Sequence, residues 1–482
     1  MSVIKSLFSE IAMRTILIPS LLILVLCVGC TQTTSEPSNA VSEPGGAVSV
    51  PDMPDSAGIP NLGALELTAD SSSSWTIFGG LNRDNVSPET GLLKSWSEGG
   101  PPLLWKASEV GSTEYPGYSS VTVAEGRVFT AGNVRTGEND QEAHAYVFAL
   151  DERTGKEIWR YRNGAAWTDR GHYPGERGTP TIDADRVYAY SAVGRIACLE
   201  AATGKEIWAR DLRAEYEATL PIWAFAESPY IDGNKVILWI GGEKAAVVAL
   251  NKMTGEPIWT TPSTGQRGGY ASMIVFDHGG QRIYVNTNQK GVLGVHAETG
   301  AQLFFIPHET SWDVLATTPH FFDGKLFITS GYGTGAKLYR LNVSGNTITP
   351  EEIWENKNFD NQHGGIVIKD GYVYTATHNY GRGRNWVCLK LEDGTIAWEN
   401  PGVFMGSLTS ADGMLYCMSE REGEVALVKA TPEGYEETGR FRLPSQEEGG
   451  GVGMFWAHPV VVNKKLFLRH GNILYCYDVA AK

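Results

Sequence analysis

The residues best suited to chemistry in this sequence stand directly before apolar, strand-like stretches. Six such places are unusually polar or aromatic, and they read YSS, RGTP, WAFAESP, GY, HGG and WAHP. The candidate pocket residues there are Tyr118, Arg177, Trp223, Glu227, Tyr270, His363, Trp456 and His458. A guanidinium, a carboxyl group and two imidazoles that converge on one cavity could bind an anion, a sugar or a quinone. Hydrogen bonds to water at a channel mouth would account for the same residue types, so the catalytic residues stay unknown.

Sequence motifs for other chemistries are absent. The stretch GYGTGAK (331–337) has glycines and a lysine but lacks the spacing of a phosphate-binding loop. The chain contains no Gly-x-Ser-x-Gly motif of a serine hydrolase. Its ten histidines never occur with His-x-x-x-His spacing, so we predict no metal site.

A sequence motif that recurs along the chain, here called the word, indicates which elements position the pocket residues. The chain reads ALDERTGKEIW at 149–159, CLEAATGKEIW at 198–208 and ALNKMTGEPIW at 249–259, and drifted copies follow. Each word is an apolar run, a turn that contains Thr and Gly, and a second apolar run that ends in a large aromatic residue. The word therefore predicts a β-hairpin whose outer strand ends in an aromatic side chain.

A second hairpin pattern precedes each word, as in GTPTIDADRVYAYSA (178–192) and TPHFFDGKLFITSG (318–331). Each unit then contains four short strands, and units of this length that repeat are typical of a β-propeller. The first strand of each blade lines the central channel, which is how residues before these strands could surround one pocket.

The two ends of the repeat region indicate how the ring closes. The chain ends on ILYCYDVAAK (473–482), a third strand with no fourth, and PLLWKA (102–107) supplies the missing strand. We predict an all-β, eight-bladed β-propeller of four-stranded antiparallel blades, closed by pairing of N- and C-terminal strands, which hides both sheet edges. The segment 73–93 is expected to lie across the bottom or the side of the propeller.

The closing aromatic residues are predicted to be structural. A tryptophan on an outer strand can lie flat against the next blade while its N–H donates to a backbone carbonyl there. The structural docking aromatics are Trp105, Trp159, Trp208, Trp259, Phe304, Trp354, Trp398 and Phe441.

The words quoted above resemble the tryptophan-docking repeat of the quinoprotein, or PQQ-like, propellers. The segments FGGLNRDNVSPETGLL (78–93), WAFAESPYIDG (223–233) and HPVVVNKKLFLRHGNILYCYDV (458–479) look most similar to exported propellers of that family. The resemblance implies the propeller fold. It leaves function open, because the same repeat builds PQQ-dependent alcohol dehydrogenases and the cofactor-free outer-membrane assembly lipoprotein BamB.

Two classes of function follow from the resemblance. The dehydrogenases often hold PQQ beneath adjacent cysteines, and some carry a haem at Cys-x-x-Cys-His, but neither pattern occurs here. We therefore favour a non-catalytic binding or scaffold protein, with no cofactor expected and protein or β-strand peptide partners on its faces. The alternative is an alcohol or sugar dehydrogenase that uses PQQ with Ca²⁺.

The N-terminus predicts export. Lys5 and Arg14 precede an apolar run at 16–28, which suits a signal peptide, and LCVGC (26–30) resembles the bacterial lipobox. The resemblance implies lipid on Cys30 and a membrane-anchored lipoprotein that faces the periplasm or the exterior; an ordinary cleaved signal peptide is the alternative. The predicted domains are a signal peptide (1–29), a flexible tether (30–74) rich in Ser, Pro and Gly, and the propeller (75–482).

Charge and cysteine usage narrow the partners further. The net charge of −15 and the lack of a basic run argue against nucleic acid as a partner. Cys198, Cys388 and Cys476 occupy equivalent places in three repeats, so we expect mostly small buried thiols. Only Cys417 and Cys476, in consecutive repeats, could lie close enough to pair.

Overall fold

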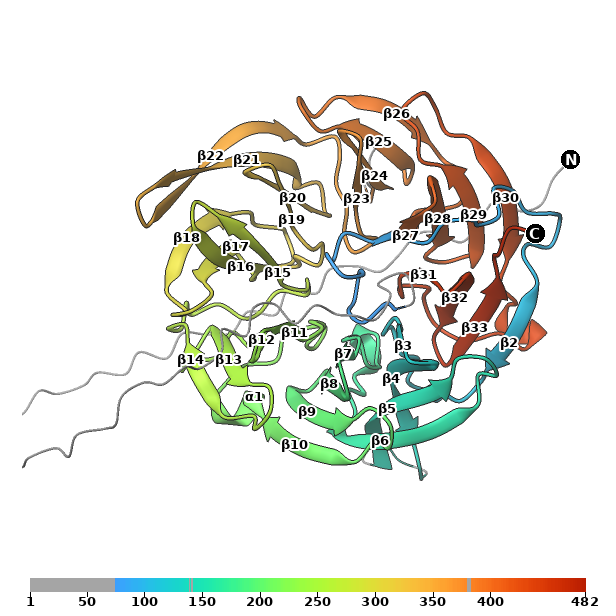
Figure 1. Cartoon of the computed structure of the whole chain (residues 1–482), viewed down its shortest axis with the longest axis horizontal. Coiled ribbons are helices and arrows are strands. Elements are labelled where there is room, and N and C mark those ends of the chain that lie inside the picture. Colours follow the sequence, from blue (N-terminus) through green and yellow to red (C-terminus); the bar gives the residue numbers. More distant parts are fainter. Residues whose placement is uncertain (1–73, 138, 140–141, 379–382) are drawn as a thin grey trace, which may run out of the picture. The chain divides into compact units, whose positions relative to one another are not determined.

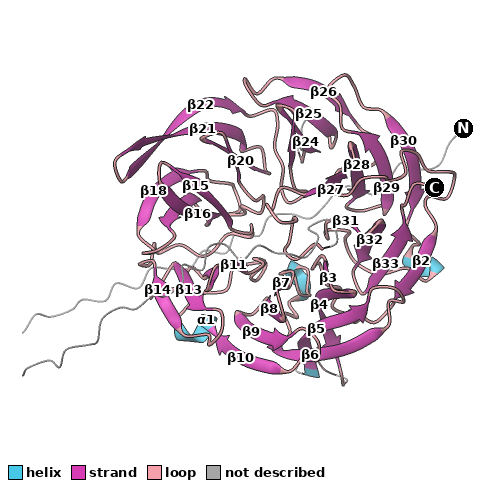
Figure 2. Cartoon of the chain, viewed as in Figure 1, coloured by secondary structure: helices cyan, strands magenta, loops and turns pink. Residues whose placement is uncertain are grey.

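Eight antiparallel sheets arranged in a ring make up the described part of the chain (Figures 1 and 2). The structure is a computed structural model, and it describes residues 74–137, 139, 142–378 and 383–482. The predicted signal peptide (1–29), the lipidation site Cys30 and all but the last residue of the predicted tether (30–74) lie outside the described residues. Within the described residues, no helix combines the length and the hydropathy that crossing a bilayer requires.

Seven blades contain four strands that pair in sequence order from the centre outward, and in blade 8 the outermost strand comes from the segment before blade 1. Blade 1 contains β3 (Thr122–Ala124), β4 (Arg127–Arg135), β5 (Ala143–Asp151) and β6 (Glu157–Ala165). Blade 2 contains β7 (Thr181–Asp183), β8 (Arg186–Tyr190), β9 (Arg195–Glu200) and β10 (Glu206–Asp211), followed by α1 (Leu212–Glu215). Blade 3 contains β11 (Tyr230–Asp232), β12 (Lys235–Trp239), β13 (Val247–Asn251) and β14 (Pro257–Thr260). Blade 4 contains β15 (Ile274–His278), β16 (Gln281–Thr287), β17 (Gly291–His296) and β18 (Gln302–Pro307).

The second half of the ring repeats this plan. Blade 5 contains β19 (His320–Phe322), β20 (Lys325–Ser330), β21 (Gly335–Ser344) and β22 (Thr347–Asn356). Blade 6 contains β23 (Val367–Lys369), β24 (Tyr372–Ala376), β25 (Trp386–Lys390) and β26 (Ile396–Asn400). Blade 7 contains β27 (Gly406–Ala411), β28 (Met414–Ser419), β29 (Glu424–Lys429) and β30 (Glu437–Arg442). Blade 8 contains β31 (Val460–Val462), β32 (Lys465–His470), β33 (Ile473–Asp478) and β2 (Leu103–Ala107). Short 3₁₀ turns occur at Arg170–His172 and Gln446–Glu448.

The ring closes as the sequence predicts. β2 pairs antiparallel with β33, and its Trp105 lies opposite Cys476. One sheet therefore holds strands from the two ends of the repeat region, and β2 covers the edge that β33 would otherwise expose. The predicted fold, an all-β propeller of eight four-stranded blades, is confirmed.

Six outer strands place an indole against the next blade. The indole N–H donates to a backbone carbonyl there, with N···O distances of 2.8–3.0 Å. The donor–acceptor pairs are Trp105–Glu152, Trp159–Ala201, Trp208–Lys252, Trp259–Ala297, Trp354–Leu391 and Trp398–Thr431. Phe304 and Phe441 stand at the same place in blades 4 and 7, where both rings are buried and neither has a hydrogen to donate.

The Thr-Gly turn of the word receives the indole of the preceding blade. Gly155 has φ of +70°, and a Cβ on it would lie 2.5 Å from the Trp105 ring. Only glycine combines this backbone conformation with such a close approach. The outer strand also shifts register by one residue just before the aromatic, as between Glu157 and Trp159, and this bulge helps to aim the ring.

The segment before β2 lies at the centre of the ring, which corrects our prediction of a path along the bottom or side. Trp75 pairs with Val123 of the inner strand β3. The Arg83 guanidinium donates to the carbonyl oxygens of Ser228 and Pro229, both at 2.8 Å. β1 (Val86–Ser87) then pairs in parallel with β27 as a fifth strand (Figure 1).

Only the later part of this segment reaches the hairpin turns, as expected. Glu89 accepts the backbone N–H of Asn463 at 2.9 Å, and Leu92 donates to Asp412 at 2.9 Å. Both partners lie in turns between the first and second strands of their blades. The inner strands begin at the opposite end, so the segment passes through the channel rather than around it.

The four described cysteines are free and buried. Cys417 packs among residues of blades 6 and 7, whereas Cys476 packs with residues of blades 8 and 1. The two thiols therefore belong to different inter-blade cores, and the pair that we considered does not form. Burial raises the pKa of the Cys476 thiol to about 12, so it stays protonated at neutral pH.

Candidate functional site

A cavity of about 440 Å³ opens among the loops that precede the inner strands. Seven of the eight candidate pocket residues line it, namely Tyr118, Arg177, Trp223, Tyr270, His363, Trp456 and His458. The eighth, Glu227, is turned into blade 3, where its carboxyl group accepts from the Trp239 backbone at 2.6 Å and from the Asn286 amide at 2.8 Å. Glu227 is thus a buried structural group rather than a lining residue.

Aromatic rings form much of the cavity wall. Trp456 stands at their centre, with ring centroids 4.9 Å from Tyr118, 4.6 Å from Tyr173 and 5.4 Å from His363. Trp312 lies at the mouth and is 62% exposed, which is unusual for a tryptophan in a folded protein. Walls of this kind suit a flat or apolar ligand surface.

The charged groups on the lining are mostly cationic. Arg83, Arg177 and Arg421 line the cavity together with a single carboxylate, that of Glu420. Burial lowers the pKa of Arg83 and of Arg177 to about 10, which leaves both guanidinium groups charged at neutral pH. Arg177 lies over the Tyr118 ring at 5.4 Å and donates to the Gly175 carbonyl at 2.9 Å.

Arg83 carries the least compensated charge. It is 2% exposed, and its Nε and Nη1 have no hydrogen-bond partner among the described residues. Glu227 is the nearby carboxyl group, but burial raises the pKa of Glu227 to about 8, so this group is largely protonated at neutral pH. A buried cation without a charged partner is costly, and an anion in the adjacent cavity would offset that cost.

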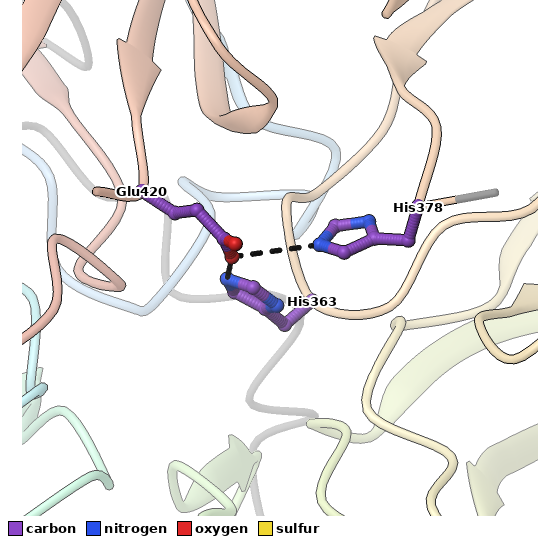
Figure 3. Close-up of side chains that lie close together, drawn as sticks. All are labelled: His363, His378 and Glu420. Carbon is purple, nitrogen blue, oxygen red and sulfur yellow. Dashed lines mark ion pairs between the residues drawn. The ribbon is translucent and has the colours of Figure 1, made fainter. Parts of the chain in front are cut away.

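A second group of titratable residues lies at the same cavity. His363, His378 and Glu420, which we call the His–Glu cluster, face one another from blades 6 and 7 (Figure 3). The Nε2 atoms of His363 and His378 lie 3.5 and 3.6 Å from Glu420 Oε2. The Trp456 indole also approaches this oxygen, at 3.3 Å.

The electrostatics of the cluster set the protonation of His363 and of Glu420. Burial lowers the pKa of His363 to about 3, so this imidazole is neutral at neutral pH. Burial would raise the pKa of Glu420, but the nearby imidazoles of His378 and His363 and the Trp456 indole outweigh this effect and hold the pKa at about 2. The cluster thus presents an ionised carboxylate between two imidazoles.

Sequence reasoning missed His378 and Glu420. Glu420 directly follows the second strand of its blade, and His378 lies two residues beyond the second strand of the blade before it. The candidates were sought only before first strands. The available signal was the polar pair that ends each of these strands, Thr377-His378 and Ser419-Glu420. In this ring, the loops before the first strand and after the second strand open toward the same cavity.

The lining residues do not fit the calcium-bound quinone that the resemblance implies for dehydrogenases. Calcium takes six to eight oxygen ligands, usually with several carboxylates, whereas Glu420 supplies the single carboxylate among the described lining residues. No cysteine in the described part of the chain lines the cavity. We therefore derive no chemistry through PQQ.

Comparison with known proteins gives the same two groups of relatives. The chain is 27% identical over 147 residues to the quinohemoprotein alcohol dehydrogenase ADH-IIG of Pseudomonas putida, a match that covers 28% of this chain and 18% of that protein. It is 23% identical over 291 residues to the outer membrane protein assembly factor BamB of Moranella endobia (strain PCIT), covering 56% of this chain and 69% of that protein. The chain thus spans less than a fifth of the first relative's length.

Solved structures share the fold at low identity. BamB from Moraxella catarrhalis superposes with a TM-score of 0.53 at 14% identity, covering 76% of this chain and 95% of that one. The quinohemoprotein alcohol dehydrogenase of Comamonas testosteroni superposes with a TM-score of 0.58 at 13% identity, covering 86% and 82%. The family model described as outer membrane protein assembly factor BamB matches residues 143–400. That match covers more than half of the sequence, so the chain belongs to this family of PQQ-like propellers.

Proposed function

We propose that the chain is an exported, lipid-anchored, non-catalytic binding protein of the cell envelope, and that its central cavity binds a small organic anion with a flat, apolar body. The observation that carries the proposal is a cationic, aromatic cavity in a strongly acidic chain. Three guanidinium groups face one carboxylate there, while the net charge is −15.

The charge balance supports an anion. Burial lowers the pKa of His458 to about 4, so this imidazole adds no positive charge at neutral pH, and Glu227 adds little negative charge. The guanidinium groups therefore dominate the field in the cavity, and low-dielectric walls focus that field on a bound ligand. The ring surfaces of Tyr118 and Trp456 provide the contact area for its flat part.

Protein partners remain part of the proposal. Large apolar side chains stand exposed near the cavity mouth, with Trp312 at 62%, Tyr173 at 44% and Ile222 at 40%. Exposed aromatic residues at a rim are typical of contact surfaces. The BamB relative is named for a role in outer-membrane protein assembly, which supports a partner of the envelope.

A titration with two matched probes tests the anion site. We expect naphthalene-2-carboxylate to quench cavity tryptophan fluorescence and to bind at least about tenfold more tightly than uncharged 2-naphthalenemethanol, the effect of one charge-assisted hydrogen bond. The substitution Arg83→Gln should reduce this preference, and Arg153→Gln, at an exposed turn, should leave it intact. Equal binding of both probes to the unaltered protein would refute the anion site.

The dehydrogenase alternative is tested separately. Its support is the alcohol dehydrogenase relative and the same cationic aromatic cavity, which would also accept a flat polycarboxylate. PQQ is added with and without Ca²⁺, and absorbance and dye reduction are measured with alcohols and aldoses. Calcium-dependent binding with turnover would replace our proposal, whereas calcium-independent binding without turnover would support it.

For the anchor, Cys30→Ala should release the protein from the membrane fraction, and unchanged partitioning would exclude lipidation.

A further inference from the structure

The His–Glu cluster plays no part in the proposed anion binding, and its geometry needs a separate explanation. One ligand atom from each of its three residues lies within 4.8 Å of the other two. The Nε2 atoms of His363 and His378 are buried and have no hydrogen-bond partner among the described residues. Two unpartnered imidazole nitrogens beside a carboxylate are the donor set that first-row divalent metals prefer.

The contacts around Glu420 are unusually long for a buried carboxylate. Its neighbours are His363 at 3.5 Å, His378 at 3.6 Å, Trp456 at 3.3 Å and Arg421 at 3.4 Å. Charge-assisted hydrogen bonds normally measure about 2.7–2.9 Å. The shortest of these contacts, from the Trp456 indole, is itself a long hydrogen bond, so a small cation between the three cluster residues could bond to each of them after small side-chain shifts.

The fold holds two of the three residues firmly. Asp360 accepts the backbone N–H of His378 at 3.0 Å and also binds Thr377 at 2.9 Å and Gly333 at 2.8 Å. Glu420 follows β28, and its backbone pairs with Met405 and Phe455. His363 is the more open member and lies against the cavity, so a ligand could reach the cluster from that side.

We propose that His363, His378 and Glu420 form a binding site for a first-row divalent transition-metal ion, with Zn²⁺ the best match to two imidazoles and one carboxylate. The site goes beyond the proposed anion binding and does not depend on it. A water or a ligand from the cavity would complete the coordination. The hard ions Ca²⁺ and Mg²⁺ are disfavoured, because only one of the three donors is an oxygen.

One hydrogen bond, from the Gln362 backbone to His378, opposes metal binding. Gln362 donates its backbone N–H to His378 Nδ1 at 3.2 Å, so in the metal-free protein the ring proton sits on Nε2. When a metal binds Nε2, that proton must leave and Nδ1 must become protonated, and the Gln362 N–H loses its acceptor. The metal complex should therefore bind more weakly than a site in which Nδ1–H already donates to an oxygen.

Cobalt titration of the chelator-treated, full-length protein tests the proposal. We expect one Co²⁺ per chain with visible absorption bands, displaced by Zn²⁺. Glu420→Gln and His378→Asn should each weaken binding by about tenfold or more. His308→Asn removes a buried histidine outside the cluster and should leave binding unchanged. Absence of stoichiometric binding to the unaltered protein, or unchanged binding in both cluster variants, would overturn the site.

A spectroscopic measurement adds a readout that simple loss of stability would not produce. In ¹⁵N-histidine spectra, added Zn²⁺ should move the His378 proton from Nε2 to Nδ1, and an unchanged tautomer at saturating Zn²⁺ would overturn the proposal. The naphthalene-2-carboxylate titration is repeated on the chelator-treated protein. Failure of the metal site leaves that titration unaffected, so the two proposals fail separately.

Discussion

Outer strands and inner loops of this propeller differ in how they use the repeat. Six blades carry a tryptophan at the same place of the outer strand, each with the same hydrogen bond to the next blade. Around the cavity, by contrast, corresponding loops carry Tyr118, Arg177, Trp223, Tyr270 and His363, a different set in each blade. The residues that join blades therefore repeat from blade to blade, whereas the residues that form the candidate site differ between blades.

The two regions also differ in their physical chemistry. At the blade interfaces, the six docking indoles each donate to a backbone carbonyl of the next blade. The cavity contains Arg83 with unpartnered donors and Glu420 with long contacts. Unsatisfied groups destabilise a fold and persist where a ligand uses them. The following changes test this contrast, from the largest expected effect to the smallest.

Removal of Pro102–Lys106 should have the largest effect. It deletes most of β2, so β33 loses its outer partner and its edge is exposed. We expect a broad, low-temperature transition in calorimetry instead of a single cooperative one. Shortening the exposed β21–β22 hairpin by residues 344–346 is the control and should keep the cooperative transition. A deletion protein that melts as sharply and as hot as the intact one would contradict closure by β2.

Truncation of a docking indole should have the next largest effect on stability. Trp159→Ala removes a buried ring and its hydrogen bond to Ala201, which should lower the free energy of unfolding by about 3–5 kcal/mol in denaturant titrations. Trp312→Ala, at the exposed cavity mouth, should stay within about 0.5 kcal/mol. Similar losses for both would show that the outer ring has no special role.

Alanine at the turn glycine tests the same interface from its other side. Gly155→Ala forces positive φ on alanine and brings Cβ against Trp105, which should cost about 1–3 kcal/mol. Gly434 is the matched control, because no atom lies within 4 Å of a Cβ built there and its φ is not positive. Equal stability of the two variants would mean that the Thr-Gly turn does not hold the indole.

The pH dependence of stability probes the buried carboxyl near the cavity. The folded-state pKa of Glu227 is about 8, above its usual value of 4.5, so folding takes up a proton between these values and stability should fall as pH rises through this window. Glu227→Gln should flatten this fall. The substitution should not remove the fall in stability completely, because burial also raises the pKa of Glu176, to about 7. Denaturant midpoints from pH 5 to 8 measure the slope, and an unchanged slope would contradict the buried, protonated state of Glu227.

Much of the fold could be predicted from the sequence because its signals are local and repeated. The Thr-Gly turn recurs in the first four blades and drifted copies follow, each with a closing aromatic residue, so hairpins, blade number and closure by β2 all follow from spacing. The path of residues 75–87 could not be predicted, because the bonds of Arg83 to Ser228 and Pro229 join positions about 145 residues apart with no repeated pattern.

The site was predictable only in part for the same reason. Residues before inner strands share a position in the repeat, so their convergence follows from the fold. Whether a side chain turns to the cavity or into its blade depends on non-local partners, and Glu227 turns inward because Trp239 and Asn286 offer donors. His378 and Glu420 come from equivalent places in two consecutive blades, but the repeat does not indicate that the two side chains turn toward each other.

Pairing of β2 with β33 has a consequence for biosynthesis. A chain synthesised from its N-terminus delivers β2 before any complete blade exists, and this strand must wait until the residues at 473–478 have been made. Until then every intermediate has a free edge in blade 8. A prematurely ended polypeptide can therefore build seven blades, but it cannot close the ring, because the partner strand of β2 is missing.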